Sequence, residues 1–392
     1  MQPRPLSAPQ VQALLDGDTL LLSYSLGEAR SVLWAVTAQS IASFELPGRA
    51  VLEAAARRFH EGLSVHDPAG RVRRAAGAAA LGRLLLGPVA ERLDRQRLVV
   101  VPDGALEYVP FGALPEPGGG ALAGPILERH EVVYLPSASA LAIQRQVLER
   151  RPPAPKRLLV LADPVFDVDD PRLARLASTR GKAPAARGIS RGGDGPAFER
   201  LPGSRQEAEA IAALAPAEPA GSTRLALDFD ASRSEALSDR LSAYRIVHFA
   251  THGILDAEHP ALSGLALSMV DRAGQPQAGF LHLHDLYNLR LNADLVVLSG
   301  CRTALGKEVR GEGLIGLTRG FLYAGAPRVV ASLWRVEDLA TAALMTRFYH
   351  ALWSERLRPA AALRAAQLSL RQQRRWRDPY FWAGFVLEGD WQ

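Results

Sequence analysis

The chain has 392 residues, of which 48% are hydrophobic and 22% charged, a composition typical of a folded protein rather than a disordered one. This length exceeds one ordinary core and predicts two domain-sized units, or one large sheet in two parts. The net charge of +5 belongs to a chain in which Gly and Pro are also abundant. We read this as a general bias of composition, so the charge by itself does not indicate nucleic-acid binding. No apolar run is long enough to cross a membrane, and residues 1–10 do not resemble an export signal. We therefore expect a cytoplasmic protein with no membrane or nucleic-acid partner.

Cys301 is the only cysteine in the chain, which limits the thiol-based sites that the protein can form. A single thiol excludes an intramolecular disulfide and any zinc site built on several thiolates, and it suits a reducing compartment. Two histidine pairs, His248 with His252 and His282 with His284, have spacings that metals use, but neither has a third and fourth ligand nearby. We expect no metal and no cofactor.

Residues 1–150 combine strands and helices, and we expect them to form one α/β half of the protein. The stiff segment Arg151–Pro155 is the predicted boundary, because three of its five residues are proline. In this half the predicted strands are Thr19–Ser25, Arg30–Thr37, Arg97–Pro102 and Glu131–Leu135, and the predicted helices are Val51–Gly62, Arg71–Asp94 and Ala138–Arg150.

Residues 156–392 are predicted to form the second half, with strands and helices in alternation. Asp163–Pro202 is rich in Gly, Pro and Arg, so it is expected to be a long polar loop that is either functional or disordered. Alternation of Val- and Leu-rich strands with helices predicts a three-layer α/β/α sandwich around a mostly parallel sheet. The predicted strands are Arg157–Ala162, Arg245–Phe249, Leu265–Met269, Asp294–Leu298, Arg328–Leu333 and Trp382–Leu387, and the helices are Arg205–Leu214, Gly313–Tyr323, Glu337–Trp353 and Ala360–Gln373.

Two of these strands end in residues that can do chemistry. His252 follows one strand and Cys301 follows another, each beside a glycine. Ligands of open α/β sheets bind at the carboxyl ends of the strands, so both side chains are expected at one sheet edge. A thiol becomes a strong nucleophile when an imidazole takes its proton. The backbone N–H groups of Gly253 and Cys301 are the predicted oxyanion hole.

Taken singly, His252 and Cys301 are each explained more simply by a structural role than by a catalytic one. A lone cysteine is usually a small buried apolar residue, and a lone histidine at a strand end usually has no catalytic role. The combination of the two, each at the end of a buried strand, favours a catalytic dyad.

Several segments resemble the CHAT family, caspase-like cysteine peptidases of the clan that includes caspases, clostripain and separase. By this resemblance His252 is the catalytic histidine and Cys301 the catalytic cysteine. It also implies a pseudo-caspase half (1–150) followed by an active half (156–392). The segments that carry the resemblance are Val100–Leu114, Tyr134–Leu141, Leu201–Ala208, Val247–Gly253, Leu295–Gly306, Gly311–Gly320 and Ala324–Asp338.

The resemblance also bears on the substrate pocket. Relatives that cleave after basic residues carry an acidic residue two positions before the cysteine, but this chain has Ser299 there, which does not support an Arg- or Lys-specific pocket. By similarity to caspases, residues 331–338 should line the substrate cleft, which makes Ser332, Trp334 and Asp338 further candidates. Trp334 is equally compatible with a place in the core, and Asp338 with the start of a helix.

The function we expect is that of a cysteine endopeptidase acting on a partner protein. The resemblance implies a regulated bacterial signalling or defence role, and gasdermin-type pore formers are one substrate class of relatives. CHAT units usually follow TPR repeats, which this sequence lacks, so an activating partner or a TPR region would act in trans or lie outside this chain. The alternatives are a catalytically silent interaction scaffold and a Cys-dependent amidase or acyltransferase.

Overall fold

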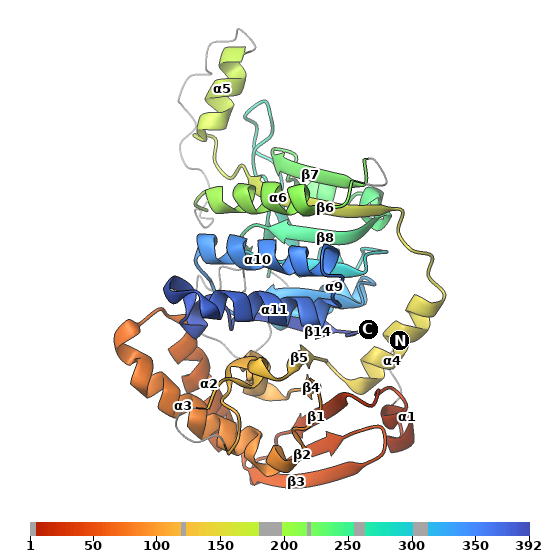
Figure 1. Cartoon of the computed structure of the whole chain (residues 1–392). Coiled ribbons are helices and arrows are strands. Elements are labelled where there is room, and N and C mark those ends of the chain that lie inside the picture. The colour runs from red at the N-terminus through yellow and green to blue at the C-terminus, as the bar shows by residue number, and fades with distance from the viewer. Residues whose placement is uncertain (1–4, 119–122, 180–197, 218–220, 255–262, 301–312) are drawn as a thin grey trace.

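One continuous 11-stranded sheet organises the protein (Figure 1). The computed structural model describes residues 5–118, 123–179, 198–217, 221–254, 263–300 and 313–392. Across the sheet the strand order is β3-β2-β1-β4-β5-β14-β13-β12-β8-β6-β7. Their bounds are β1 Thr19–Ser25, β2 Arg30–Val36, β3 Ile41–Pro47, β4 Arg97–Val101, β5 Glu131–Tyr134, β6 Lys156–Pro164, β7 Thr223–Asp228, β8 Tyr244–Ala250, β12 Leu295–Leu298, β13 Arg328–Ser332 and β14 Phe385–Gly389.

Neighbouring strands are parallel except in the β1–β2–β3 meander and between β13 and β14. Because β14 is antiparallel to β13 and parallel to β5, strand direction reverses in the middle of the sheet. The carboxyl ends of β8 and β12 therefore lie at one edge, and the carboxyl end of β4 lies at the opposite edge. The predicted α/β class with a mostly parallel sheet is confirmed.

Helices cover both faces of the second half, as the alternation of side chains along β8 shows. His248 of β8 contacts Tyr349 on α10, whereas the next residue, Phe249, packs its ring 5.5 Å from Phe321 on α9. Since successive strand residues point to opposite faces, α10 and α9 lie on opposite sides of the sheet. Helix α10 packs between α6 and α11, and these three form the row in front of the sheet in Figure 1. The bounds are α6 Pro202–Leu214, α9 Gly313–Tyr323, α10 Asp338–Trp353 and α11 Pro359–Gln372.

The helices of the first half follow the same logic. In α2 (Arg49–Ser64) the buried residues are Leu52, Ala56, Phe59 and Leu63, a spacing of three to four that places them on one face toward the core. Helix α4 (Ala138–Glu149) begins at Ser137, whose side chain accepts a hydrogen bond from the Ala140 N–H, as expected for an N-cap.

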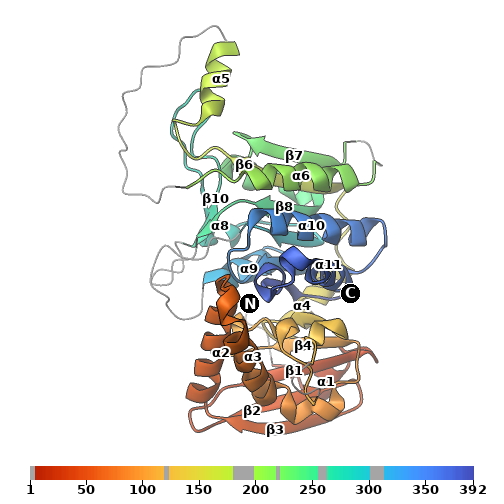
Figure 2. The ribbon, with the colours of Figure 1, turned by 60° about the vertical axis from the view of Figure 1, so that its left-hand side comes forward.

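Several elements differ from those expected. Strands β3 and β7 were not predicted, and the predicted helix 71–94 is α3 (Arg71–Leu85) followed by a 3₁₀ helix, Gly87–Arg92. The segment 163–202 is not simply a loop, because it contains α5 (Pro171–Thr179), which projects beyond the β6–β7 end of the sheet in both views (Figures 1 and 2). The second-half strand predicted at 265–269 is shorter, β10 (Gly264–Ala266), and belongs to a separate three-stranded sheet with β9 (Gly253–Ile254) and β11 (Phe280–His282).

The domain boundary that we predict at Arg151–Pro155 stays a prediction. The sheet itself crosses from one half to the other, through the pairing of β5 with β14.

Candidate active site

The carboxyl ends of β8 and β12 lie side by side. The two strands are parallel neighbours with Leu298 opposite Phe249, and the pairing continues past both strands. The Ser299 N–H donates to the Phe249 carbonyl at 3.0 Å, and the Gly253 N–H donates to the Gly300 carbonyl at 3.1 Å. The two residues before Cys301 are thus hydrogen-bonded to Phe249, three residues before His252, and to Gly253, directly after it.

Glycine is required at position 300 by this close approach. A Cβ at Gly300 would lie 2.2 Å from the carbonyl oxygen of Thr251 and within 3 Å of two further backbone atoms of the same residue. No side chain fits there without moving the backbone beside His252. The sequence feature that suggested a turn before Cys301 is therefore also what allows the two strand ends to meet.

His252 is buried, with 3% of its surface exposed, and its contacts define its orientation. Its Nε2 lies 2.7 Å from the carbonyl oxygen of Glu199, which can only accept, so Nε2 carries the proton. The rings of Phe166 and Phe198 pack against the imidazole, with centroids at 5.4 and 5.6 Å. In the neutral ring the lone pair is then on Nδ1, the atom that would take a proton from a thiol.

A small pocket, open to solvent, adjoins His252. Two carboxylates, Glu207 of α6 and Asp338 of α10, contribute to its wall, and Arg335 also lines it. Burial raises the pKa of Asp338, the negative charges of Glu207 and Glu337 add to this, and Arg335 and His252 oppose it. The lining residues that bear on chemistry are Glu207, His252, Ser299, Gly300, Arg335 and Asp338.

The helices that form this pocket approach closely at a second glycine. A Cβ at Gly203, near the start of α6, would lie 2.7 Å from the Cβ of Asp338 at the start of α10. The two helix N-termini therefore meet at the pocket, which explains why both contribute to its wall.

Behind the pocket, His248 joins a buried polar network. It is completely buried on β8, with Nδ1 2.9 Å from the Tyr349 hydroxyl and Nε2 3.1 Å from the Ser299 hydroxyl. A Glu207 carboxylate oxygen lies 2.8 Å from the same Nε2. Burial holds the pKa of Tyr349 well above its usual value, so its hydroxyl stays protonated. His248 is therefore a structural residue that links β8, α6, α10 and the turn after β12, as expected for a histidine inside a strand.

The structure brings some predicted site residues together and separates others. Cys301 lies outside the described residues, whereas Ser299 and Asp338 line the pocket beside His252. Ser332 and Trp334 are each 1% exposed and are not among its lining residues.

The two buried residues have internal partners instead. The Ser332 hydroxyl donates to the Trp334 carbonyl at 2.6 Å, and the Trp334 indole N–H donates to the Tyr380 carbonyl at 2.9 Å. The side chains of Ser332, at the end of β13, and of Trp334, just beyond it, therefore lie in the core, and the pocket gives no support to the expectation that they bind substrate.

The predicted oxyanion hole also needs correction. The Gly253 N–H donates to the Gly300 carbonyl, so in this conformation it is not available to bind an oxyanion. The contact instead joins the two strand ends, which is a structural role that the pattern of glycines alone did not suggest.

Four residues around the site were not predicted: Phe166, Phe198, Glu199 and Glu207. Glu207 lies in Leu201–Ala208, a segment that carried the family resemblance, so a signal existed for it. The other three lie in the polar stretch 163–202, where composition gives no hint of a contact with a strand end.

No group of three or more metal-ligating side chains is found among the described residues. Within the same ranges, no helix has the length and apolarity needed to cross a bilayer.

Comparison with solved structures shows the fold. The separase–securin complex of Saccharomyces cerevisiae aligns with a TM-score of 0.53 and 11% identity, over 97% of this chain and 31% of that chain. The Arg-specific cysteine proteinase gingipain R aligns over 81% of this chain and 69% of that chain, with a TM-score of 0.45 and 11% identity. By its similarity to the separase structure, the α/β architecture is caspase-like.

Sequence comparison adds the family. Tetratricopeptide repeat protein 28 of Mus musculus and its counterpart in Homo sapiens are each 27% identical over an alignment of 333 residues that covers 77% of this chain and 12% of theirs. This chain thus spans about one eighth of the length of those relatives. The model of the CHAT domain matches residues 75–390, which is most of the sequence. The chain belongs to the CHAT domain family.

Proposed function

We propose that this chain is a cysteine endopeptidase that cleaves a partner protein with a dyad of His252 and Cys301. The observation that supports the proposal most directly is the hydrogen bond between Gly253 and Gly300, because it ties the residue before the only cysteine to the residue after His252. CHAT family membership and the caspase-like fold support the same chemistry.

The reaction would begin with transfer of the Cys301 proton to Nδ1 of His252. The thiolate attacks the scissile carbonyl carbon, a C–S bond forms, and the carbonyl electrons move onto oxygen. Collapse of this intermediate breaks the C–N bond, and His252 returns the proton to the departing amine. Water then attacks the thioester carbon while His252 takes a proton from it, the C–S bond breaks to release the carboxylic acid, and His252 returns the proton to the Cys301 sulfur.

The Glu199 carbonyl suits this cycle. By accepting a hydrogen bond from Nε2–H it favours the tautomer with a basic Nδ1, and it also stabilises the imidazolium formed during catalysis. A nucleophile, a base and a group that orients the base form the usual arrangement of such sites. The Cys301 N–H remains the proposed oxyanion donor, and Gly253 is not retained in that role.

The pocket beside His252 is the proposed site for the substrate side chain before the scissile bond, with Ser299 and Asp338 in its wall. A regulated signalling or defence role remains part of the proposal, with gasdermin-type proteins as one candidate class of substrate. The named relatives are tetratricopeptide repeat proteins, which supports a TPR region, in trans or in a longer protein, as the activating element.

The test is cleavage of a proteome-derived peptide library, with new termini identified by mass spectrometry. New termini are expected with the wild type and should be absent with Cys301→Ala and with His252→Ala. His284→Ala is the matched control, because that histidine is 61% exposed in its side chain and distant in sequence from both strand ends. Identical termini with Cys301→Ala would refute the proposal. A reactive thiol without any peptide cleavage would favour the amidase or acyltransferase, and an unreactive thiol the scaffold.

A further inference from the structure

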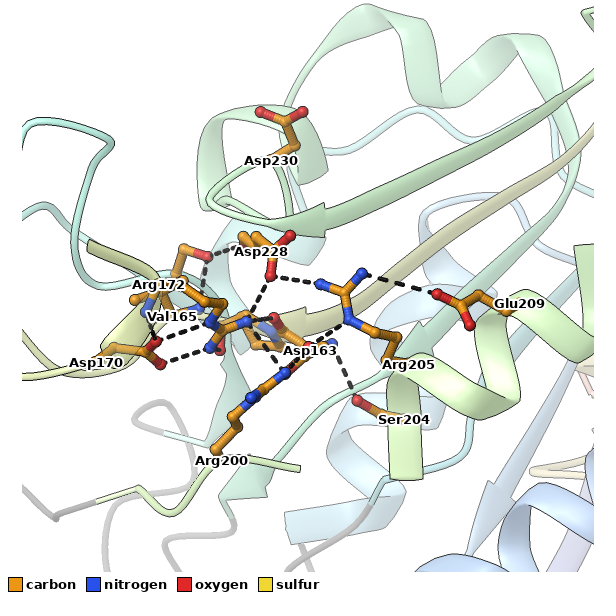
Figure 3. Close-up of polar contacts among 12 residues, drawn as sticks. Asp163, Val165, Asp170, Arg172, Arg200, Ser204, Arg205, Glu209, Asp228 and Asp230 are labelled. Carbon is orange, nitrogen blue, oxygen red and sulfur yellow. Dashed lines mark hydrogen bonds and ion pairs between the residues drawn. The ribbon is translucent and has the colours of Figure 1, made fainter. Parts of the chain in front are cut away.

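A cluster of arginines and aspartates lies at the carboxyl end of β6, and Figure 3 shows its contacts. Its centre is Asp163, a completely buried residue at the end of β6. Arg200 binds this carboxylate with two hydrogen bonds, Nε to Oδ1 at 2.9 Å and Nη2 to Oδ2 at 2.8 Å. Arg205 adds a third at 2.8 Å, and Arg172 lies 3.2 Å away.

The position of Asp163 is itself defined by the sheet. Strand β6 is the parallel neighbour of β8, with Ala162 opposite Ala250, so Asp163 stands one residue beyond this pair at the same edge as His252. The Asp163 N–H donates to the Ser204 hydroxyl at 3.0 Å, which joins it to the first turn of α6. A buried carboxylate needs such partners, because an unpaired charge in the interior is very costly.

Arg200 connects Asp163 to the imidazole of His252. It directly follows Glu199, whose carbonyl oxygen accepts from Nε2 of His252, and Phe198 on the other side of Glu199 packs on the imidazole face. Two-point binding of a guanidinium to a carboxylate restricts orientation as well as distance. Fixing the Arg200 side chain therefore restricts the backbone that presents the Glu199 carbonyl.

We propose that Arg200 is a positioning residue for His252: its bidentate bond to Asp163 holds the Glu199 carbonyl on Nε2 and thereby selects the tautomer with a basic Nδ1. The role rests on the proposed function, since it matters for catalysis only if His252 is the base. No direct contact between Arg200 and substrate is involved.

In an alternative role, residues 198–201 only cover His252. The two roles predict opposite changes in the reactivity of the dyad when Arg200 is lost. If Arg200 positions the imidazole, its loss lowers the reactivity of the dyad, whereas if the segment only covers the imidazole, its loss raises reactivity. A direct reading of the His252 ring separates them further, because covering does not require one tautomer.

The experiment compares full-length wild type with Arg200→Ala and Arg200→Lys. Arg200→Lys keeps the positive charge but loses the two-point geometry, and it keeps the test informative if the alanine variant folds poorly. Arg224→Ala is the matched control. The Arg224 side chain is 40% exposed against 42% for Arg200, and it makes a single ion pair with Glu235 at 3.0 Å, on the neighbouring strand β7.

The first readout is the ¹⁵N NMR signal of the His252 ring, identified by its loss in His252→Ala. The wild type and Arg224→Ala should show the Nε2–H tautomer, and Arg200→Ala should show a mixture, with Arg200→Lys between them. The second is the alkylation rate of Cys301 by iodoacetamide, which reports one site because the chain has one cysteine. Arg200→Ala should slow it roughly tenfold, part of the hundredfold or more that a general base supplies.

An unchanged tautomer in Arg200→Ala, or faster alkylation, would overturn the positioning role. Failure of the proposed function looks different: alkylation would then be the same in wild type and His252→Ala. An alkylation rate that depends on His252 but not on Arg200 would support the dyad and refute only the positioning role of Arg200.

Discussion

The backbone N–H of Gly253 donates a hydrogen bond to the carbonyl of Gly300, over 3.1 Å. One residue follows His252 and the other precedes Cys301, so this bond extends the pairing of β8 with β12 to the point where the chemistry is expected. The sheet thus brings two distant parts of the sequence together through a backbone hydrogen bond.

Gly300→Ala should abolish cleavage and lower the free energy of unfolding by about 1–3 kcal/mol, the usual cost of forcing an extra methyl into a packed site. The added Cβ would overlap the Thr251 carbonyl and displace the strand end that carries His252. Urea unfolding and peptide cleavage measure the two effects. The control is Gly77→Ala on α3, where nothing lies within 4 Å, and helix propensity predicts a neutral or slightly stabilising change. Full activity in Gly300→Ala would disprove the need for this close approach.

Glu388 on β14 predicts a pH dependence of stability. Burial raises its pKa from 4.5 to about 7, although the Thr318 hydroxyl donates to it and Arg319 lies nearby. The folded state therefore binds a proton more tightly than the unfolded state, so this contribution to stability is complete below about pH 4.5 and is lost as the pH rises through 7.

Glu388→Gln should remove this dependence, because glutamine mimics the protonated acid. The free energy of unfolding of the variant should exceed that of wild type by roughly 3 kcal/mol at pH 8.5 and by almost nothing at pH 4.5, the difference expected for a shift of this size. Urea titrations at the two pH values measure the difference. An equal effect of the substitution at both values would contradict the raised pKa.

The buried network around His248 predicts a stability effect that spares the chemistry. Tyr349→Phe removes the hydroxyl that contacts Nδ1 of His248 and should cost about 1 kcal/mol of unfolding free energy. Peptide cleavage at a temperature well below unfolding should stay within a fewfold of wild type. Tyr323→Phe, at a residue that is 65% exposed, should change neither quantity. A loss of cleavage in Tyr349→Phe as large as in His252→Ala would assign His248 a catalytic part.

Trp334 and the adjacent Arg335 should have opposite phenotypes. Trp334→Phe loses packing volume and the bond to the Tyr380 carbonyl, so we expect a loss of about 2 kcal/mol and an unchanged peptide preference. Arg335 is exposed and lines the pocket, so Arg335→Ala should leave stability within about 0.5 kcal/mol and alter which peptides are cleaved. A changed preference in Trp334→Phe with stability retained would return Trp334 to the pocket wall.

Local patterns predicted most of the fold because they follow from burial. The runs of Val and Leu in β4 and β12 and the spaced apolar residues of α2 depend only on which side meets the core. Strand β7 escaped prediction because only its Ala226 is fully buried, so its sequence lacks a strong apolar signal. The end of α3 at Leu85 is set by tertiary contacts and by Pro88, just beyond it.

The site was predictable only in part, because local sequence patterns do not encode contacts between distant segments. His252 and Ser299 were identifiable because each follows a strand, and parallel strands end at a common edge. The Glu199 carbonyl and Glu207 reach His252 and His248 across large gaps in sequence, and no local pattern encodes such contacts. Trp334 was ambiguous because one tryptophan suits a pocket wall and a core equally well until its neighbours are known.

The most direct test of the central claim is intact-mass spectrometry of the full-length chain with a peptidyl acyloxymethyl ketone, a probe that needs an activated thiolate. The account predicts one adduct on Cys301 in the wild type, none in Cys301→Ala, and labelling at least roughly a hundredfold slower in His252→Ala, the contribution expected of a general base. Equal labelling rates in wild type and His252→Ala would contradict it.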